Sequence, residues 1–236
     1  MREVIAPLLI LIAIAFAAYN GEPVASQRAV AVPSPTPVVA DTIDRNTSTP
    51  YDGDLSIFED AQRDKNLQID RVMDILKING DRTVADIGAG SGWFTVRSAR
   101  RTAGKVYAVE INQEYIDHIN KRAATDKLAN ITTVLGKFDD PTLPKDSVDA
   151  VLILKTYHEI EQPIRFMNNL RTALRKGALV GIIDKNGTGD DHGLDRDKVV
   201  DELKRAGFVL EGEYDFVKPD RMDYFLVFTV AEARTK

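Results

Sequence analysis

The sequence contains no cysteine among its 236 residues. This absence excludes a disulfide framework, thiolate metal sites and a cysteine nucleophile. The sequence also lacks a basic surplus, because 31 lysines and arginines stand against 36 aspartates and glutamates, a net charge of -5. A dedicated nucleic-acid-binding protein is therefore not expected. Function must come from carboxylates, histidines, hydroxyls and backbone groups.

Long apolar runs are scarce, and the one that stands out is at the N-terminus. Residues 4–19 carry no charge, are almost wholly aliphatic and follow Arg2. This layout is typical of a secretory signal, while the run is short for a spanning helix, which needs about 20 residues. We predict that residues 1–20 are a signal peptide, cleaved near Ala17, or a membrane anchor. The protein is then membrane-anchored or exported to the periplasm of a bacterium, with a cytoplasm-facing orientation left open.

Residues 21–50 change character, with five prolines among alanine, valine, serine and threonine. Proline removes a backbone donor and fixes φ, so no helix or central strand persists there. We interpret this stretch as a Pro-rich linker. Residues 51–236 then form the folded domain.

Within this domain the hydrophobic pattern alternates between the periods of helix and strand. Helices are predicted at 93–101, 114–124, 164–175 and 195–206, and strands at 83–87, 106–109, 131–135, 148–154, 179–184, 208–217 and 223–230. Such alternation indicates an α/β fold, with a mostly parallel sheet covered by helices on both faces. The last two strands are predicted to form an antiparallel hairpin near one edge. Ligands are expected at the carboxyl ends of the parallel strands.

The sharpest motif is a glycine loop between the first strand and its helix. Asp86 is followed by Gly88, Gly90 and Gly92, which let the backbone turn tightly and approach a ligand. The bulky Trp93 stands where a dinucleotide-binding fingerprint expects glycine or alanine. No lysine followed by serine or threonine is present in the loop, so a phosphate-binding P-loop is excluded.

An acidic residue ends the next strand. Glu110 lies 20 residues beyond Gly90, the spacing at which a carboxylate can bind both hydroxyls of a ribose. The alternative is that Glu110 only caps the helix beginning near Gln113. We favour the ribose role because strand, glycines, helix, strand and acid follow one another in the required order.

These residues, from Asp86 to Gly92 with Glu110, resemble the motif of the class I S-adenosylmethionine-dependent methyltransferases, over about residues 57–236. The resemblance implies a Rossmann-like three-layer sandwich whose seven-stranded, mostly parallel sheet has one antiparallel strand. It also implies that Asp86 and the Gly88 backbone hold the amino-acid moiety of S-adenosylmethionine, and Glu110 its ribose. A cofactor that is cationic and lacks phosphate suits a carboxylate-rich loop.

The resemblance further implies that an acid after the third strand binds the adenine amino group. Asp139 is the candidate, with Phe138 packing on the ring, although Lys137 departs from the usual spacing and can shift the role to Asp140. The alternative is a plain turn built on Asp-Asp-Pro.

The fourth strand leads into a cluster of titratable residues, Tyr157, His158 and Glu159. Histidine exchanges protons near neutral pH, so His158 is our candidate for removing a proton from the methyl acceptor, oriented by Glu159 or Tyr157. The alternative is a helix start in which His158 is a capping or core residue. In some members of the family an acid stands where this chain has Lys155, which argues against a metal-assisted mechanism, and no metal site is predicted. The polar loop 184–193, with His192, can close over an acceptor, bind a metal loosely or have no role.

The sequence therefore predicts an enzyme that transfers a methyl group from S-adenosylmethionine to an oxygen or nitrogen of a small molecule. The alternatives are an NAD-dependent oxidoreductase, disfavoured by Trp93, and a tethered module that binds S-adenosylmethionine without catalysis. No nucleic-acid partner is expected. Membrane association, if present, is through residues 4–19.

Overall fold

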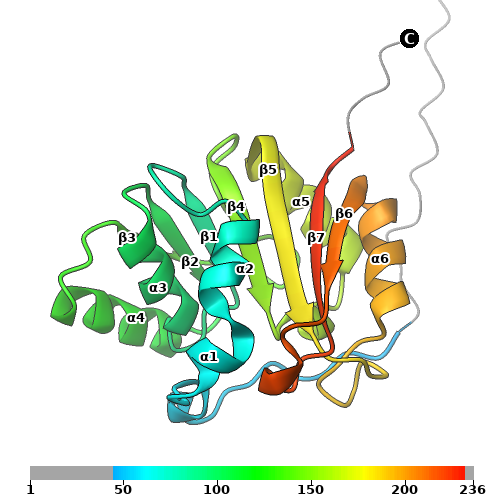
Figure 1. Cartoon of the computed structure of the whole chain (residues 1–236), viewed down its shortest axis with the longest axis horizontal. Helices are drawn as coiled ribbons and strands as arrows, with labels where there is room; N and C mark the ends of the chain where they lie inside the picture. The colour runs from blue at the N-terminus through cyan, green and yellow to red at the C-terminus, as the bar shows by residue number, and fades with distance from the viewer. Residues whose placement is uncertain (1–44, 232–236) are drawn as a thin grey trace, which may run out of the picture. The chain divides into compact units, whose positions relative to one another are not determined.

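The computed structural model describes residues 45–231, which alternate between helices and strands (Figure 1). The helices are α1 (Arg63–Leu67), α2 (Ile69–Ile75), α3 (Trp93–Arg101), α4 (Gln113–Thr125), α5 (Pro163–Ala173) and α6 (Arg196–Arg205), with 3₁₀ turns η1 (Leu55–Phe58), η2 (Tyr157–Glu159) and η3 (Lys218–Asp220). The strands are β1 (Val84–Ile87), β2 (Val106–Glu110), β3 (Ile131–Leu135), β4 (Val148–Leu154), β5 (Leu174–Asp184), β6 (Phe208–Tyr214) and β7 (Tyr224–Val230).

The strands form one seven-stranded sheet in the order β3-β2-β1-β4-β5-β7-β6. All neighbours from β3 to β5 pair in parallel, whereas β7 is antiparallel to both β5 and β6. The predicted Rossmann-like sheet with one antiparallel strand is confirmed. The strand order reverses between β1 and β4, and in such sheets the crevice at this switch point, at the carboxyl ends of the strands, is the expected ligand site.

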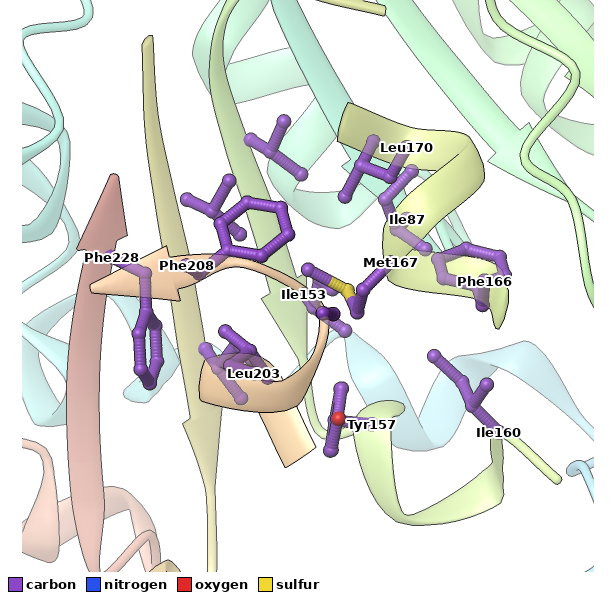
Figure 2. Close-up of a cluster of buried hydrophobic side chains, with 14 of the residues drawn as sticks. Ile87, Ile153, Tyr157, Ile160, Phe166, Met167, Leu170, Leu203, Phe208 and Phe228 are labelled. Atoms are coloured by element: carbon purple, nitrogen blue, oxygen red, sulfur yellow. The ribbon is translucent and has the colours of Figure 1, made fainter. Parts of the chain in front are cut away.

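Side chains that alternate along each strand bury the two faces of the sheet under different helices. Val84 faces the cluster that includes buried residues of α2 and α3. Ala85 and Ile87 face the opposite cluster, to which α5 contributes Met167 and α6 contributes Leu203. Figure 2 shows Met167 and Leu203 packed near Ile87 and Ile153 in this second cluster. The two covered faces complete the predicted three layers.

The predicted boundaries differ most from the structure around β5 and at the end of β6. The helix predicted to reach residue 175 ends at Ala173, and β5 begins at once at Leu174. An irregularity in the pairing of β4 with β5, near Gly177 with its φ of +76°, lets the chain pass from helix to strand without a loop. The strand predicted to end at 217 ends at Tyr214. Hydrophobic patterns locate elements better than they locate element ends.

The first described residues are packed on the domain. The Arg45 side chain is fully buried, donates to the Glu202 carboxylate over 2.9 Å and donates to the carbonyl of Ile160 over 2.9 Å. The Ser48 hydroxyl donates to the carbonyl of Gly189 over 2.7 Å. In Figure 1 this segment, drawn in blue, runs past the carboxyl ends of the parallel strands. Residues 45–50 therefore contact the domain, although the linker was predicted to extend to residue 50.

The remaining predicted N-terminal features, the signal or anchor at 1–20 and the linker as far as 44, lie outside the described residues. Within residues 45–231 no helix combines the length and the apolar character needed to cross a membrane.

Candidate cofactor and acceptor site

A cavity of about 1000 Å³ opens at the carboxyl ends of β1, β2 and β4. Its wall includes the glycine loop, Glu110 and His158, and the segment around Tyr51 and Phe58 contributes aromatic rings. Pockets for small molecules have volumes of about 300 to 1,000 Å³, so this cavity can hold a cofactor together with a small second ligand. Most of the residues predicted to form the site thus share one cavity.

The glycine loop needs glycine because of its backbone conformation and, at Gly88, because a side chain would have no space. Gly88, Gly90 and Gly92 all have positive φ values, of +70°, +53° and +75°. A Cβ on Gly88 would also lie 2.4 Å from a side-chain atom of Thr156, at the end of β4. Gly92 does not line the cavity but directly precedes α3. The loop therefore brings bare backbone to the cavity and packs directly against the β4 turn.

Asp86 is the last but one residue of β1, lines the cavity and is 2% exposed. Its carboxylate accepts a hydrogen bond from the Thr95 hydroxyl over 2.6 Å. Burial disfavours the charged form and raises the pKa of Asp86 to about 6, despite the opposing hydrogen bond from Thr95. A bound cation would relieve this desolvation, as expected for a residue that holds an amino-acid ammonium group.

Glu110 connects the end of β2 to the glycine loop. Its Oε2 accepts from the Gly90 amide over 3.0 Å, and its Oε1 accepts from the Ile111 amide over 2.7 Å. The alternative role as a helix cap is taken by Asn112, whose side chain accepts from the Glu114 amide over 2.8 Å at the start of α4. Each carboxylate oxygen has a further lone pair. Glu110 can therefore accept ribose hydroxyls while holding the loop.

The end of β3 differs from its prediction. Phe138 lines the cavity and is 61% exposed, as an aromatic surface for a base would be. Asp139 does not line the cavity, because its carboxylate pairs with Arg165 over 3.1 Å, and Asp140 does not line it either. Asp139 is therefore corrected from a cavity residue to a partner of α5. Lys137, the residue that departs from the family spacing, does line the cavity.

His158 is held by a residue at the end of the neighbouring strand. The imidazole is 1% exposed, and its Nδ1 lies 2.8 Å from Oδ2 of Asp184, the last residue of β5. Oδ1 of Asp184 accepts from the Lys185 amide over 2.9 Å, so both oxygens of this carboxyl group have a hydrogen-bond partner. We assign the Nδ1 proton to the bond with Asp184, which leaves Nε2 with its lone pair toward the cavity.

Two further side chains surround this free nitrogen. Oε1 of Glu159 lies 3.8 Å from His158 Nε2, and the His192 ring stands edge-on at a centroid distance of 5.8 Å. Burial raises the pKa of Glu159 to about 7, against the lowering effect of His158. The structure thus gathers His158, Glu159 and His192 at one end of the cavity.

Tyr157 was predicted beside His158 as a catalytic residue, and the structure corrects this. Its side chain is fully buried and does not line the cavity. Its hydroxyl donates to Glu202 over 3.0 Å. Figure 2 shows Tyr157 among the apolar side chains of the core beneath α6. Neighbouring residues in a 3₁₀ turn point in different directions, so only His158 and Glu159 reach the cavity.

Sequence reasoning missed three residues that shape this site. Arg63 lines the cavity, stacks on Trp93 at 4.5 Å and can bind a carboxylate. Asp184 was noted only as the start of a polar loop, although its place at a strand end was a usable signal. Arg45 lies in a Pro-rich neighbourhood, and no local pattern marks it as a buried residue.

The donor set fits S-adenosylmethionine. The loop offers backbone free of Cβ atoms, two carboxylates for a cationic ligand with ribose hydroxyls, and an exposed aromatic ring for a base. Trp93 is 3% exposed in the core, at the position where a dinucleotide-binding fingerprint has a glycine for close helix–strand packing, and the two carboxylates would repel a pyrophosphate. The site therefore favours a nucleoside without phosphate.

Comparison with known proteins agrees with this geometry. Residues 84–177 match the family described as a methyltransferase domain. An uncharacterised methyltransferase of Mycobacterium tuberculosis is 34% identical over 102 residues, which cover 43% of this chain and 39% of the relative. The chain thus matches about two fifths of the length of that curated relative.

Solved structures share the fold at low identity. A SAM-dependent methyltransferase from Aquifex aeolicus superposes with a TM-score of 0.68 and 20% identity, over 76% of this chain and all of that one. The [4+2]-cyclase SpnF gives a TM-score of 0.62 at 16% identity, over 81% of this chain and 88% of that one. These likenesses concern the fold, which carries more than one chemistry. The family match over residues 84–177, the glycine motif and the shared fold together support a class I S-adenosylmethionine-dependent methyltransferase.

Proposed function

We propose that this protein transfers the methyl group of S-adenosylmethionine to an oxygen or nitrogen of a small molecule. The observation that carries the proposal is that one cavity joins the glycine loop to His158, whose Nδ1 is bound by Asp184. The first region suits a methionine nucleoside. The second places an acidic and basic pair where the methyl acceptor would lie.

At the cofactor end, where all three residues line the cavity, Asp86 would hold the ammonium group, Arg63 the carboxylate and Glu110 the ribose. Tyr51 and Phe58 close the cavity from the N-terminal side, with their rings 5.4 Å apart. Such cover excludes water, which would otherwise weaken the electrostatic contacts.

At the acceptor end, the residues position the nucleophile and receive its proton. When bound, the cofactor would supply a methyl group on a sulfonium, and the neutral thioether that remains would be the leaving group. An acceptor hydroxyl would give its proton to Nε2 of His158 as its oxygen takes the methyl group and the C–S bond of the sulfonium breaks, and Asp184 would stabilise the imidazolium across the 2.8 Å bond. The segment around Tyr51 and Phe58 lines one side of the cavity and narrows the access for a folded protein surface, which favours a small acceptor.

Calorimetry with purified full-length protein tests the cofactor. S-adenosylmethionine or its demethylated product should bind more tightly than NADH, and Gly90→Arg should abolish binding by filling the backbone approach beside Phe58. Gly80→Arg is the matched control, since Gly80 has nearly the same φ, +55° against +53°, with nothing within 4 Å of its Cβ position. Preferential NADH binding would overturn the proposal in favour of an oxidoreductase.

Transfer itself requires product detection, because a binding module without catalysis would pass the calorimetric test. Small hydroxyl and amine compounds incubated with isotope-labelled cofactor should yield a labelled methyl product. With an acceptor identified, His158→Ala should lower kcat by about 100-fold or more while cofactor affinity stays the same. Lost cofactor affinity together with a lower Tm would instead assign His158 a structural role.

We also propose that residues 4–19 associate the protein with a membrane or direct its export, on the basis of their uncharged sequence. Full-length protein should fractionate with membranes or be shortened near Ala17, whereas a chain starting at residue 39 should be soluble. That start keeps Arg45 and Ser48, which contact the domain. Soluble, unshortened full-length protein in the cytosol would contradict this proposal.

A further inference from the structure

We propose that His158, Glu159 and His192 bind one divalent transition-metal ion at the acceptor end of the cavity. One ligand atom from each residue can be chosen so that all three lie within 4.8 Å of one another. All three residues line the cavity. The site is separate from the glycine loop, and its consequence for catalysis rests on the methyl transfer proposed above.

The spacing needs little adjustment for an ion. Zinc holds nitrogen and oxygen ligands at 2.0 to 2.2 Å, so tetrahedral ligand atoms stand roughly 3.4 Å apart. His158 Nε2 and Glu159 Oε1 are 3.8 Å apart. His192 is exposed, and Glu159 is only partly buried, so rotations of these two side chains can close the remaining distance.

The third ligand, His158, is already oriented as in known metal sites. Metal-binding histidines usually donate their other ring N–H to a carboxylate, which fixes the tautomer and the ring. Asp184, itself fully buried, occupies that position at 2.8 Å from Nδ1. The bond leaves Nε2 directed at Glu159 and His192.

The N-terminal segment holds both parts of the site in place. Ser48 accepts from the His192 amide over 2.9 Å and fixes the loop through Gly189. Arg45 donates to the His158 carbonyl over 3.2 Å. His192 has a left-handed φ of +57°, an unusual conformation for a residue with a side chain. This support fixes the backbone that carries the ligands, so that side-chain rotations alone can complete the ligand set.

The ligand chemistry selects the kind of ion. Two imidazoles with one carboxylate suit Zn²⁺, Fe²⁺, Co²⁺ or Ni²⁺, whereas Mg²⁺ and Ca²⁺ prefer oxygen ligands. Three protein ligands leave at least one position open, as in catalytic rather than structural zinc sites. In this protein the open position faces the cavity.

The ion would define the acceptor as a small molecule with a hydroxyl group. A hydroxyl bound to the ion loses its proton to solvent more readily, and the resulting oxygen then forms the C–O bond as the C–S bond breaks. His158 Nε2 would coordinate the ion in this state, so it would no longer take the proton itself. An amine acceptor would not need this assistance.

Cobalt titration of full-length protein treated with a chelator tests the site. Co²⁺ bound by two imidazoles and a carboxylate gives visible d–d absorption, which should saturate at one equivalent. His192→Ala and His158→Ala should abolish it, and Asp184→Asn should weaken Co²⁺ binding by about 10- to 100-fold. His118→Ala is the matched control, since His118 is exposed on α4 and is the remaining histidine of the sequence.

Each outcome of this titration decides the proposal. No saturable absorption, or the same titration curve for His192→Ala, would overturn it. Circular dichroism checks that the variants fold, and His192→Gln replaces the alanine variant if that one does not. Calorimetry with S-adenosylmethionine on the same samples separates the two proposals. Cofactor binding without Co²⁺ binding would reject only the metal site, and the reverse result would reject only the cofactor.

Discussion

The glycine loop and the His158 turn share one cavity but are assembled from the chain in opposite ways. The glycine loop, its helix and Glu110 come from one continuous stretch, residues 84–110, and are joined by hydrogen bonds within it, such as the bond from the Gly90 amide to the Glu110 carboxylate. The His158 turn is held by Asp184 from another strand and by Arg45 from the N-terminal segment. One half of the site is local, and the other depends on tertiary contacts between distant side chains.

This difference predicts where the protein is fragile. Arg45→Ala should lower the free energy of unfolding by about 3 to 5 kcal/mol, because it leaves Glu202 buried without its charged partner. Urea denaturation measures the change. The exposed pair of Arg196 and Glu213 provides the control, and Arg196→Ala should cost about 1 kcal/mol or less. Equal losses in the two variants would mean that the N-terminal segment does not support the domain.

The local half should instead respond in cofactor affinity. Glu110→Ala should weaken S-adenosylmethionine binding by about 1 to 3 kcal/mol, since ribose hydroxyls and the Gly90 amide lose their acceptor. Calorimetry measures the loss, with Glu114→Ala on the exposed start of α4 as control. Unchanged affinity would remove Glu110 from the ribose site.

The raised pKa of Asp86 predicts that its buried negative charge destabilises the cofactor-free protein. Its folded pKa of about 6 lies above the usual 3.8, so the folded state holds a proton that the unfolded state has lost. That contribution to stability is present at low pH and is lost as pH rises through 6. Asp86→Asn lacks this term, so its stability relative to wild type should improve by about 1 to 2 kcal/mol between pH 5 and pH 7.5. Cofactor-free urea titrations at both pH values check this, and a constant difference would contradict it.

The smallest expected effect is on stability and concerns Asn112, which caps α4 and, unlike Glu110, is not expected to bind the ribose. Asn112→Ala should cost about 1 kcal/mol in the free energy of unfolding, because α4 loses its N-cap acceptor. Cofactor affinity should stay unchanged, in contrast to Glu110→Ala. Loss of affinity in both variants would show that the start of α4, rather than the Glu110 carboxylate, shapes the ribose site.

The same contrast explains how much could be predicted from the sequence. The alternating elements and the glycine motif use neighbouring residues, so the sheet and the residues around Asp86 and Glu110 were predictable. Asp139 was misplaced, because nothing local shows that Arg165 lies beside it. Tyr157 was misplaced, because in this short turn Tyr157 faces the core while the adjacent His158 faces the cavity. Arg45 acts through partners far along the chain, which no spacing rule reveals, whereas Asp184 could have been found from its place at the end of a strand.

The order of the strands also sets an order for folding. The hairpin of β6 and β7 pairs residues that are close in sequence, such as Tyr214 with Phe225, whereas β1 and β4 pair residues as distant as Val84 and Ala150. Closing a longer loop costs more chain entropy, so local pairs form readily and distant ones slowly. The β1–β4 pair is also the one that brings Thr156 against Gly88. The ligand cavity is therefore completed with the most distant pairing of the sheet, and a partly folded chain with its hairpin formed still has no binding site.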